Sequence, residues 1–427
     1  MADFGIIVAV LCALLVLGFP VAFALGIAGA VGLVLTDQSL EIIPEVLYSA
    51  ADSFVLLAIP LFVLMSRILM KAGISDELFA LINAFVRHVA GGMAAGAVLC
   101  CAFFAAISGS SVTNAAAVGM VAIPALVKHG YPKRFAAGLV AAGGTLGILI
   151  PPSIPFIVYG AITDQSVGAL FLAGVVPGLV VTVLILVYAV AVSRLRGYGT
   201  PGPPIPWGER LGLLLRNVPV LALPVLILGG IYSGVFTPTE AAAAALVLAE
   251  ILASTYFRRL SLKMLWEATR ETVNVSVMIL TIVAGAKLFG HVSTTMQIPQ
   301  GFADWIQAAN IGQFEFIAAV MILLIFLGDF LDPISIILIV VPVLLPALTA
   351  LQIDPIWFGV LIVINMELAN ITPPVGLNLF VIQAIQKDIS FQEVLRGTVP
   401  FMFAIVVALL LIWWEPRLAT WLPAMAR

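Results

Sequence analysis

Four short polar segments interrupt the long apolar runs of this sequence. They span residues 108–114, 143–153, 328–335 and 365–378, and they are rich in Ser, Thr, Asn, Gly and Pro. Hydroxyl, amide and free carbonyl oxygens are ligands that suit a hard cation. A half-helix that begins after a break also offers free N–H groups to a carboxylate. The four segments therefore predict a site that holds a monovalent cation together with an organic anion.

A Pro-Pro pair lies in two of these segments, at 151–152 and 373–374. Proline removes a backbone donor and clashes with the preceding turn, so a helix must unwind there and release carbonyl oxygens. The alternative interpretation is a set of simple proline kinks, with each hydroxyl bonded back to its own helix. Four breaks that form two matched pairs favour the binding site over the kinks.

The breaks supply the candidate ligands. The first cation site would use segments 108–114 and 145–153, and the second would use segments 328–335 and 370–378. The candidate sodium ligands are Ser108, Gly109, Ser110, Ser111, Thr113, Asn114, Thr145, Gly147, Gly328, Asp329, Asp332, Ser335, Asn370, Thr372 and Gly376. The candidate contacts of the anion are Asn114, Pro151, Pro152, Ser153, Pro373, Pro374 and Asn378.

Three carboxylates, Asp329, Asp332 and Glu367, fall within the breaks. An ionised carboxylate costs at least about 2.5 kcal/mol at membrane depth, so it is usually retained for ion binding or for a polar pairing. We expect Asp332 to be needed for transport. The alternative role for Asp332 is a structural pair with Lys287, and the alternative for any one of the three carboxylates is a place at the membrane surface.

The composition requires lipid as the main solvent. Hydrophobic residues make up 63% of the 427 residues, charged residues only 10%, and the mean hydropathy is +1.20, whereas soluble domains carry about 25% charged residues. The apolar runs are long and do not alternate, which excludes a membrane β-barrel. The fold class is therefore an all-α polytopic membrane protein. A net charge of -3 without a basic tract gives no reason to expect nucleic acid.

The distribution of Lys and Arg predicts the orientation. Sixteen of the 19 basic residues fall in segments that one topology places in the cytoplasm. In that topology the N-terminus is outside, segment 71–88 forms an inner arm, and segment 291–314 forms an outer arm.

The two halves of the chain match at a constant offset. Pro-Ala-Leu occurs at 124–126 and 346–348, and the Pro-Pro pairs follow at the same spacing. We predict two inverted repeats, residues 1–196 and 217–427, joined by a cytoplasmic linker at 197–216. Each repeat would carry a re-entrant hairpin, around 108–114 or 328–335, and a broken helix, at 145–153 or 365–378. Inverted repeats with broken helices are typical of secondary transporters.

At these residues the chain resembles the large membrane subunit of tripartite ATP-independent periplasmic (TRAP) transporters, the dicarboxylate and sialic acid uptake family. The similar stretches lie at 19–26, 108–114, 144–153, 236–241 and 370–378. The resemblance implies an ion-transporter-like fold with elevator movement, sodium as the coupling ion and no other cofactor. It also implies a bacterial inner-membrane location, a small four-helix membrane subunit and a periplasmic substrate-binding protein.

Other functions remain open at this point. A self-sufficient sodium–carboxylate symporter of similar architecture would need no binding protein. A channel or an intramembrane enzyme is the remote alternative. The sequence contains no His-Glu-x-x-His motif and no Gly-x-x-x-x-Gly-Lys-Ser/Thr loop, so neither a zinc protease of that type nor a P-loop ATPase is expected.

Overall fold

The computed structural model describes residues 2–425. All regular secondary structure in these residues is helical, and they contain no strand. This confirms the expected all-α class. The first half contains α1 (Ala2–Val16), α2 (Val21–Leu35), α3 (Ile42–Ala51), the short η1 (Val55–Leu57), α4 (Ala58–Lys71), α5 (Ile74–Val86), α6 (Gly92–Ser108), α7 (Ser111–Lys128), α8 (Lys133–Thr145), η2 (Leu146–Ile148), α9 (Ile154–Thr163) and α10 (Val167–Leu195). The second half contains α11 (Trp207–Tyr232), α12 (Pro238–Ile251), η3 (Leu252–Tyr256), α13 (Leu262–Thr295), α14 (Ile298–Ala308), α15 (Gln313–Gly328), α16 (Pro333–Ala350), α17 (Pro355–Ala369), α18 (Leu377–Ile385), α19 (Phe391–Trp414) and α20 (Arg417–Met425).

Seven helices in the described part of the chain are long and apolar enough to cross a membrane, and the bent pair formed by α3 and Val55–Lys71 would make an eighth span. The two parts of that pair meet at 55°. The chain is therefore a multi-pass membrane protein, as its composition required.

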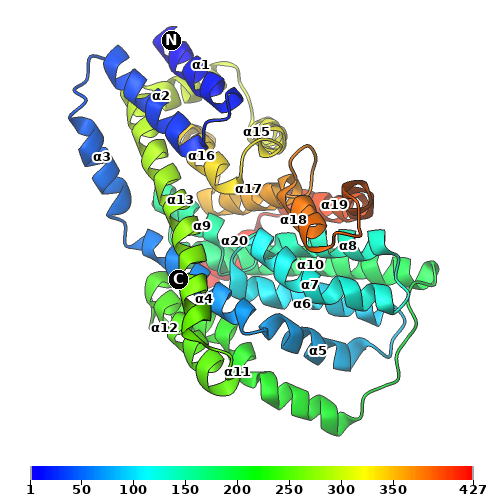
Figure 1. Cartoon of the computed structure of the whole chain (residues 1–427). Coiled ribbons are helices and arrows are strands. Elements are labelled where there is room, and N and C mark those ends of the chain that lie inside the picture. The colour runs from blue at the N-terminus through cyan, green and yellow to red at the C-terminus, as the bar shows by residue number, and fades with distance from the viewer. Residues whose placement is uncertain (1, 426–427) are drawn as a thin grey trace.

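Most of the helices fall into two groups, which Figure 1 shows. On the left of that view, α13 runs beside α2 at one end and α4 at the other, and α12 packs against α4. We call α1–α4 and α11–α13 the frame. On the right, α6, α7, α8 and α10 lie side by side, with α17, α18 and α19 against them. We call α6–α10 and α15–α19 the inner bundle, and it meets the frame where α16 packs against α13 and α6 against α4.

The inner bundle contains the same run of elements twice. Helix α7 begins at residue 111 and α16 at residue 333, while α8 begins at 133 and α17 at 355. Within each pair, the two helix starts are separated by the same number of residues. This number equals the offset between the two Pro-Ala-Leu motifs. The opposite orientation of the two halves in the membrane stays a prediction.

The elements differ from the sequence-based boundaries in two places. Only residues 197–206 of the expected linker are non-helical, because α11 already begins at Trp207, directly after the last proline of the segment. The outer arm also begins later than expected. Residues 291–295 still belong to α13, and the arm itself is the short α14, just as α5 is the arm within 71–88.

The breaks are shorter than the polar segments that predicted them. The hairpin turns comprise only residues 109–110 and 329–332. Residues 365–369 are helical, so the second broken helix opens only at 370–376. This stretch, Asn-Met-Glu-Leu-Ala, contains no helix-breaking residue. Helix α17 therefore continues until it approaches the Pro-Pro pair.

Candidate functional site

A cavity of about 230 Å³ lies where the frame meets the inner bundle. Both hairpin turns and both broken helices contribute to its wall, and α4 and α13 close it from the frame. The polar residues that line it are Ser66, Arg67, Ser108, Ser110, Ser111, Thr113, Asp332 and Asn370. The structure thus brings four segments that are far apart in the sequence to one cavity.

The tip of the first hairpin closes on its own broken helix. Gly109 ends α6 with φ +64°, a left-handed conformation that favours glycine. Its carbonyl oxygen accepts a hydrogen bond from the N–H of Ile154 at 3.3 Å. Ser110 caps α7, since its Oγ accepts a hydrogen bond from Thr113 N at 3.4 Å. The contact leaves no spare room, because a Cβ on Gly147 would lie 2.5 Å from Ser110 O.

Asn114 ties this hairpin to the broken helix behind it. It is fully buried, and its Nδ2 donates to Cys101 O at 3.1 Å and to Gly144 O at 3.2 Å. Its Oδ1 is also buried but accepts no hydrogen bond in the described structure. A buried acceptor without a donor needs an explanation, and a cation coordinated by this oxygen is one that fits the sequence prediction.

The tip of the second hairpin carries a carboxylate cap. Asp332 Oδ2 accepts hydrogen bonds from Ile334 N at 3.1 Å and Ser335 N at 3.2 Å, and Asp332 Oδ1 accepts one from the Ser335 hydroxyl. The alternative pairing with Lys287 is wrong in this conformation, because Lys287 Nζ donates to Ser49 O at 3.0 Å. The N-terminus of α16 satisfies Asp332 instead, which is the usual role of an N-cap aspartate.

A second cavity, of about 120 Å³, lies between this tip and the second broken helix. Gly328, Asp332, Asn370 and Gly376 are among its lining residues. Two polar atoms close by, Asp329 Oδ1 and Asn370 Nδ2, are buried without a partner. The second tip therefore has open space and unpaired polar atoms beside it, although a Cβ on Gly328 would lie only 2.3 Å from Ala369 Cβ of the broken helix.

The two breaks hold their threonine hydroxyls alike but differ in one amide contact. Both Pro-Pro bonds, 151–152 and 373–374, are cis. Thr145 Oγ1 donates to Ala142 O at 2.7 Å, and Thr372 Oγ1 donates to Leu368 O at 2.7 Å, so these hydroxyls bond back to their own helices. Asn378 Nδ2 instead donates across the repeat to Ala141 O at 3.1 Å. This bond joins the two broken helices to each other.

The structure groups some candidates and not others. Seven of them share the wall of the larger cavity, and Gly328 and Gly376 line only the smaller one. The remaining candidates lie outside both walls: Asn114, Thr145, Gly147, Pro151, Pro152, Ser153, Asp329, Ser335, Thr372, Pro373, Pro374 and Asn378. Since both Pro-Pro pairs are among these, they position the wall without contacting the cavity.

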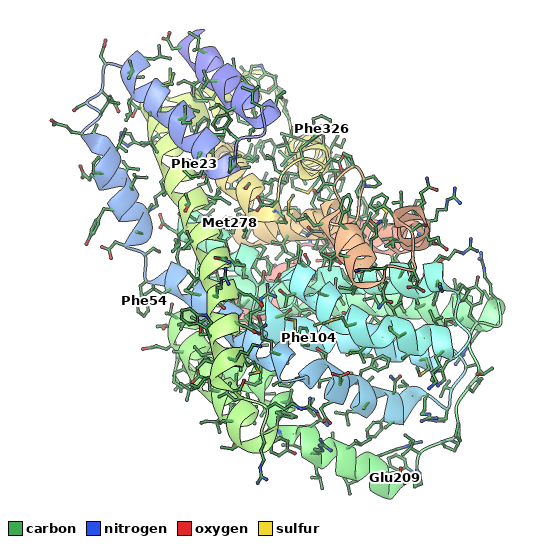
Figure 2. All side chains as sticks on the ribbon, in the orientation of Figure 1. Phe23, Phe54, Phe104, Glu209, Met278 and Phe326 are labelled. Carbon is green, nitrogen blue, oxygen red and sulfur yellow. The ribbon has the colours of Figure 1, made fainter. Side chains whose placement is uncertain are left out.

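Sequence reasoning missed the contribution of the frame. Ser66 and Arg67 of α4 and Val275, Met278 and Ile279 of α13 line the larger cavity, and Met278, labelled in Figure 2, lies about midway along α13. Neither helix has a break here to mark it. The available signal was Arg67 itself, a lone basic residue within the apolar run 58–70.

Glu367, which is not among the predicted ligands, is the most deeply buried of the three carboxylates in the breaks. It is fully buried on α17, and neither of its carboxylate oxygens has a hydrogen-bond partner in the described structure. The equivalent position in the first repeat is Thr145, whose hydroxyl is satisfied by its own helix. At this point of the broken helix, the second half therefore has an unpaired carboxyl group where the first half has a hydroxyl bonded to its own helix.

Comparison with known proteins assigns a family to this architecture. Residues 8–418 match the family model described as tripartite ATP-independent periplasmic transporter, DctM component. The C4-dicarboxylate TRAP transporter large permease protein DctM of Pseudomonas aeruginosa is 41% identical over 94% of this chain and 93% of its own length. The isethionate TRAP transporter permease protein DctMQ of Oleidesulfovibrio alaskensis is 33% identical over 93% of this chain but only 62% of its own length.

Solved structures agree with the fold. MtrF of Neisseria gonorrhoeae superposes with a TM-score of 0.63 at 16% identity, and the match covers 95% of this chain and 94% of MtrF. At this identity the likeness concerns the fold alone.

Proposed function

Since the chain belongs to the DctM family, the large permease component of TRAP transporters, we propose that it imports a small organic carboxylate, driven by a sodium gradient. The observation that carries this proposal is the larger cavity, which both hairpin tips and both broken helices enclose together with Arg67. Secondary transporters place their substrate and coupling-ion sites at such a junction of broken helices.

The chemistry of the lining supports a cation and an anion in one site. Hydroxyl and backbone oxygens of the first hairpin and the Asp332 carboxylate face the same cavity as the Arg67 guanidinium. Outside this wall, the buried Oδ1 atoms of Asn114 and Asp329 are further acceptors without a protein donor. Oxygen ligands of this kind fit sodium, whereas the guanidinium fits a carboxylate.

The proposed partners follow from the family. We expect a small membrane subunit and a periplasmic protein that delivers the substrate. The fused DctMQ relative supports the first of these, because it extends well beyond the length that this chain covers. A self-sufficient symporter that works without the binding protein is the second candidate.

The proposed mechanism is an elevator movement of the inner bundle against the frame. The two groups meet at α13–α16 and at α4–α6 and α4–α9, so the cavity has one wall on each group. Sliding of the bundle would carry the hairpin tips and the bound ions past α4 and α13. Rigid-body movement of one group of helices against another is the usual basis of alternating access in such folds.

Uptake into proteoliposomes tests the proposal. The chain and its small subunit are reconstituted, and uptake of radiolabelled succinate, isethionate and N-acetylneuraminate is measured with an inward sodium gradient or with potassium in its place. We expect sodium-dependent uptake of at least one anion, and only with the binding protein present. Ser110→Phe or Thr372→Phe should abolish it in folded protein. Uptake without sodium would refute the coupling, and uptake without the binding protein would favour the symporter.

A further inference from the structure

We propose that Arg67 binds one carboxylate of a short dicarboxylate, and that the first turn of α7 receives the other. This rests on the proposed function, because it assigns the substrate contacts of the same site. It adds a specificity-determining residue from the frame, where neither the repeat nor the helix breaks predicted one.

The bonding of Arg67 leaves donors free for a ligand. Its Nη1 lies 3.4 Å from Glu271 Oε2, and this is its one ion pair in the described chain. Its Nε is buried and has no hydrogen-bond partner. A guanidinium has five N–H donors in a planar fork that matches a carboxylate. Since the side chain is 21% exposed and makes no other hydrogen bond in the described structure, its remaining Nη donors can bind a carboxylate in the cavity.

The charge on the wall fixes where an anion can bind. Of the described residues, Arg67 is the one basic side chain that lines the larger cavity. Four helices begin at the cavity: α7, α9, α16 and α18. The starts of α9 and α18 offer few free donors, because Ile154 N donates to Gly109 O, Pro155 has no N–H, and Asn378 N donates to Asn370 O. The other two differ, because α16 is capped by the Asp332 carboxylate and α7 by the neutral Ser110 hydroxyl. The positive end of α16 is therefore already neutralised, while that of α7 is not. A second carboxylate is favoured at Ser111 and Val112.

The size and the apolar wall define the substrate further. The cavity measures about 230 Å³, below the range of about 300–1,000 Å³ that holds drug-sized ligands. Val63, Val275, Met278 and Ile279 present hydrocarbon from the frame side. These features favour a short aliphatic chain between two carboxylates, as in succinate, over a polyhydroxylated sugar acid.

Lys71 provides a matched control for a purely structural role of Arg67. It lies one helical turn further along α4, and its Nζ contacts Glu271 Oε1 at 2.9 Å and Glu267 Oε2 at 3.4 Å. Both basic side chains thus pair with the same carboxylate, and both are 21% exposed. Lys71 does not line the cavity. A structural role predicts similar effects for the two, whereas a substrate contact predicts an effect for Arg67 alone.

Two measurements test the assignment with Arg67→Gln, Arg67→Lys and Lys71→Gln. The first is the KM for succinate in the proteoliposome assay. The second is the shift in melting temperature of the purified chain with its small subunit on adding sodium succinate, against sodium chloride at equal sodium. We expect Arg67→Gln to raise KM by about tenfold to a hundredfold and to abolish the succinate shift. Arg67→Lys should give a smaller rise in KM and retain part of the succinate shift. Lys71→Gln should leave the KM and the succinate shift near their wild-type values.

The outcomes separate this inference from the proposed function. Sodium-driven succinate uptake with an unchanged KM in Arg67→Gln would overturn the role of Arg67 and leave the function standing. An Arg67-dependent succinate shift without sodium-driven uptake would retain the binding site and refute the function. Equal losses in Arg67→Gln and Lys71→Gln, or no succinate shift and no uptake in the wild type, would overturn the assignment.

Discussion

The two hairpin tips occupy equivalent positions in the repeat, yet they close on their broken helices to different degrees. The first tip is held by the bond from Ile154 N to Gly109 O and packs so closely on Gly147 that no methyl group fits. The second tip also contacts its broken helix closely, since a Cβ on Gly328 would lie 2.3 Å from Ala369 Cβ, but a cavity of about 120 Å³ lies beside that contact. A close-packed element resists displacement, whereas one beside a cavity has room to move. The second tip is therefore the better candidate for a moving gate.

The tips also differ in charge. The first has a hydroxyl cap, Ser110, and the second has a carboxylate cap, Asp332. An internal repeat duplicates the backbone plan but leaves each side chain free to diverge. Here the divergence leaves α7 with a neutral cap and α16 with a carboxylate cap, as the proposed anion at the first tip and cation at the second require.

The largest effect is expected from Gly147→Ala. The added Cβ would lie 2.5 Å from Ser110 O and 2.8 Å from Ser110 C, both backbone atoms that cannot rotate away. We expect uptake to be lost and the melting temperature to fall, since overpacking costs about 1–3 kcal/mol. The equivalent position in the second repeat is already alanine, Ala369. Ala369→Gly is the control and should have the milder effect, so equal losses would show that both tips are equally tight.

Asp332→Asn should have the next largest effect. Asparagine caps a helix about as well as aspartate does, so the melting temperature should hardly change. The loss of charge should lower uptake by about tenfold or more and raise the sodium concentration for half-maximal uptake. Sodium titrations of uptake measure this directly. Unaltered uptake would show that the carboxylate only caps α16.

The reciprocal change, Ser110→Asp, tests the charge difference from the other side. Aspartate keeps the cap of α7 but neutralises the N-terminus that we assign to an anion. The KM for succinate should therefore rise while the protein stays folded. Ser110→Asn is the neutral control. If both variants behave alike, size rather than charge governs the first tip.

Glu367→Leu sharpens the comparison between the two broken helices. The carboxyl group is fully buried without a partner, unlike Thr145 in the first repeat. Removing an unsatisfied buried polar group should stabilise the fold by about 1–3 kcal/mol, measured by thermal unfolding. Uptake should fall, because such a costly group is usually retained for function. A lower melting temperature would instead reveal an unrecognised partner of Glu367.

The smallest effect is expected from Ser153→Ala. Ser153 caps α9 by accepting from Phe156 N at 3.4 Å, and its Oγ donates to Ile148 O at 2.5 Å. The equivalent start of α18 has Gly376 and no side-chain cap. Loss of the cap should cost about 1 kcal/mol in thermal unfolding. No change would mean that the first break is not held more firmly than the second.

Several features of the site could be predicted because they depend on local chemistry. A Pro-Pro pair ends a helix wherever it occurs, so both breaks were placed before any contact was known. The boundaries were less certain, since α17 continues through Asn365–Ala369 until the chain nears the prolines. A polar residue does not by itself end a helix that is held by tertiary packing.

The sequence by itself determined the membrane-embedded helical class and the four breaks, because composition and helix-breaking residues act locally. The tertiary structure alone decided that Arg67 lines the cavity, that Asp332 caps α16 and that Lys287 lies against Ser49. Which partner a charged side chain meets depends on how distant helices are packed. Sequence spacing carries no measure of that distance, so the charges of the site could be found from sequence but their pairing could not.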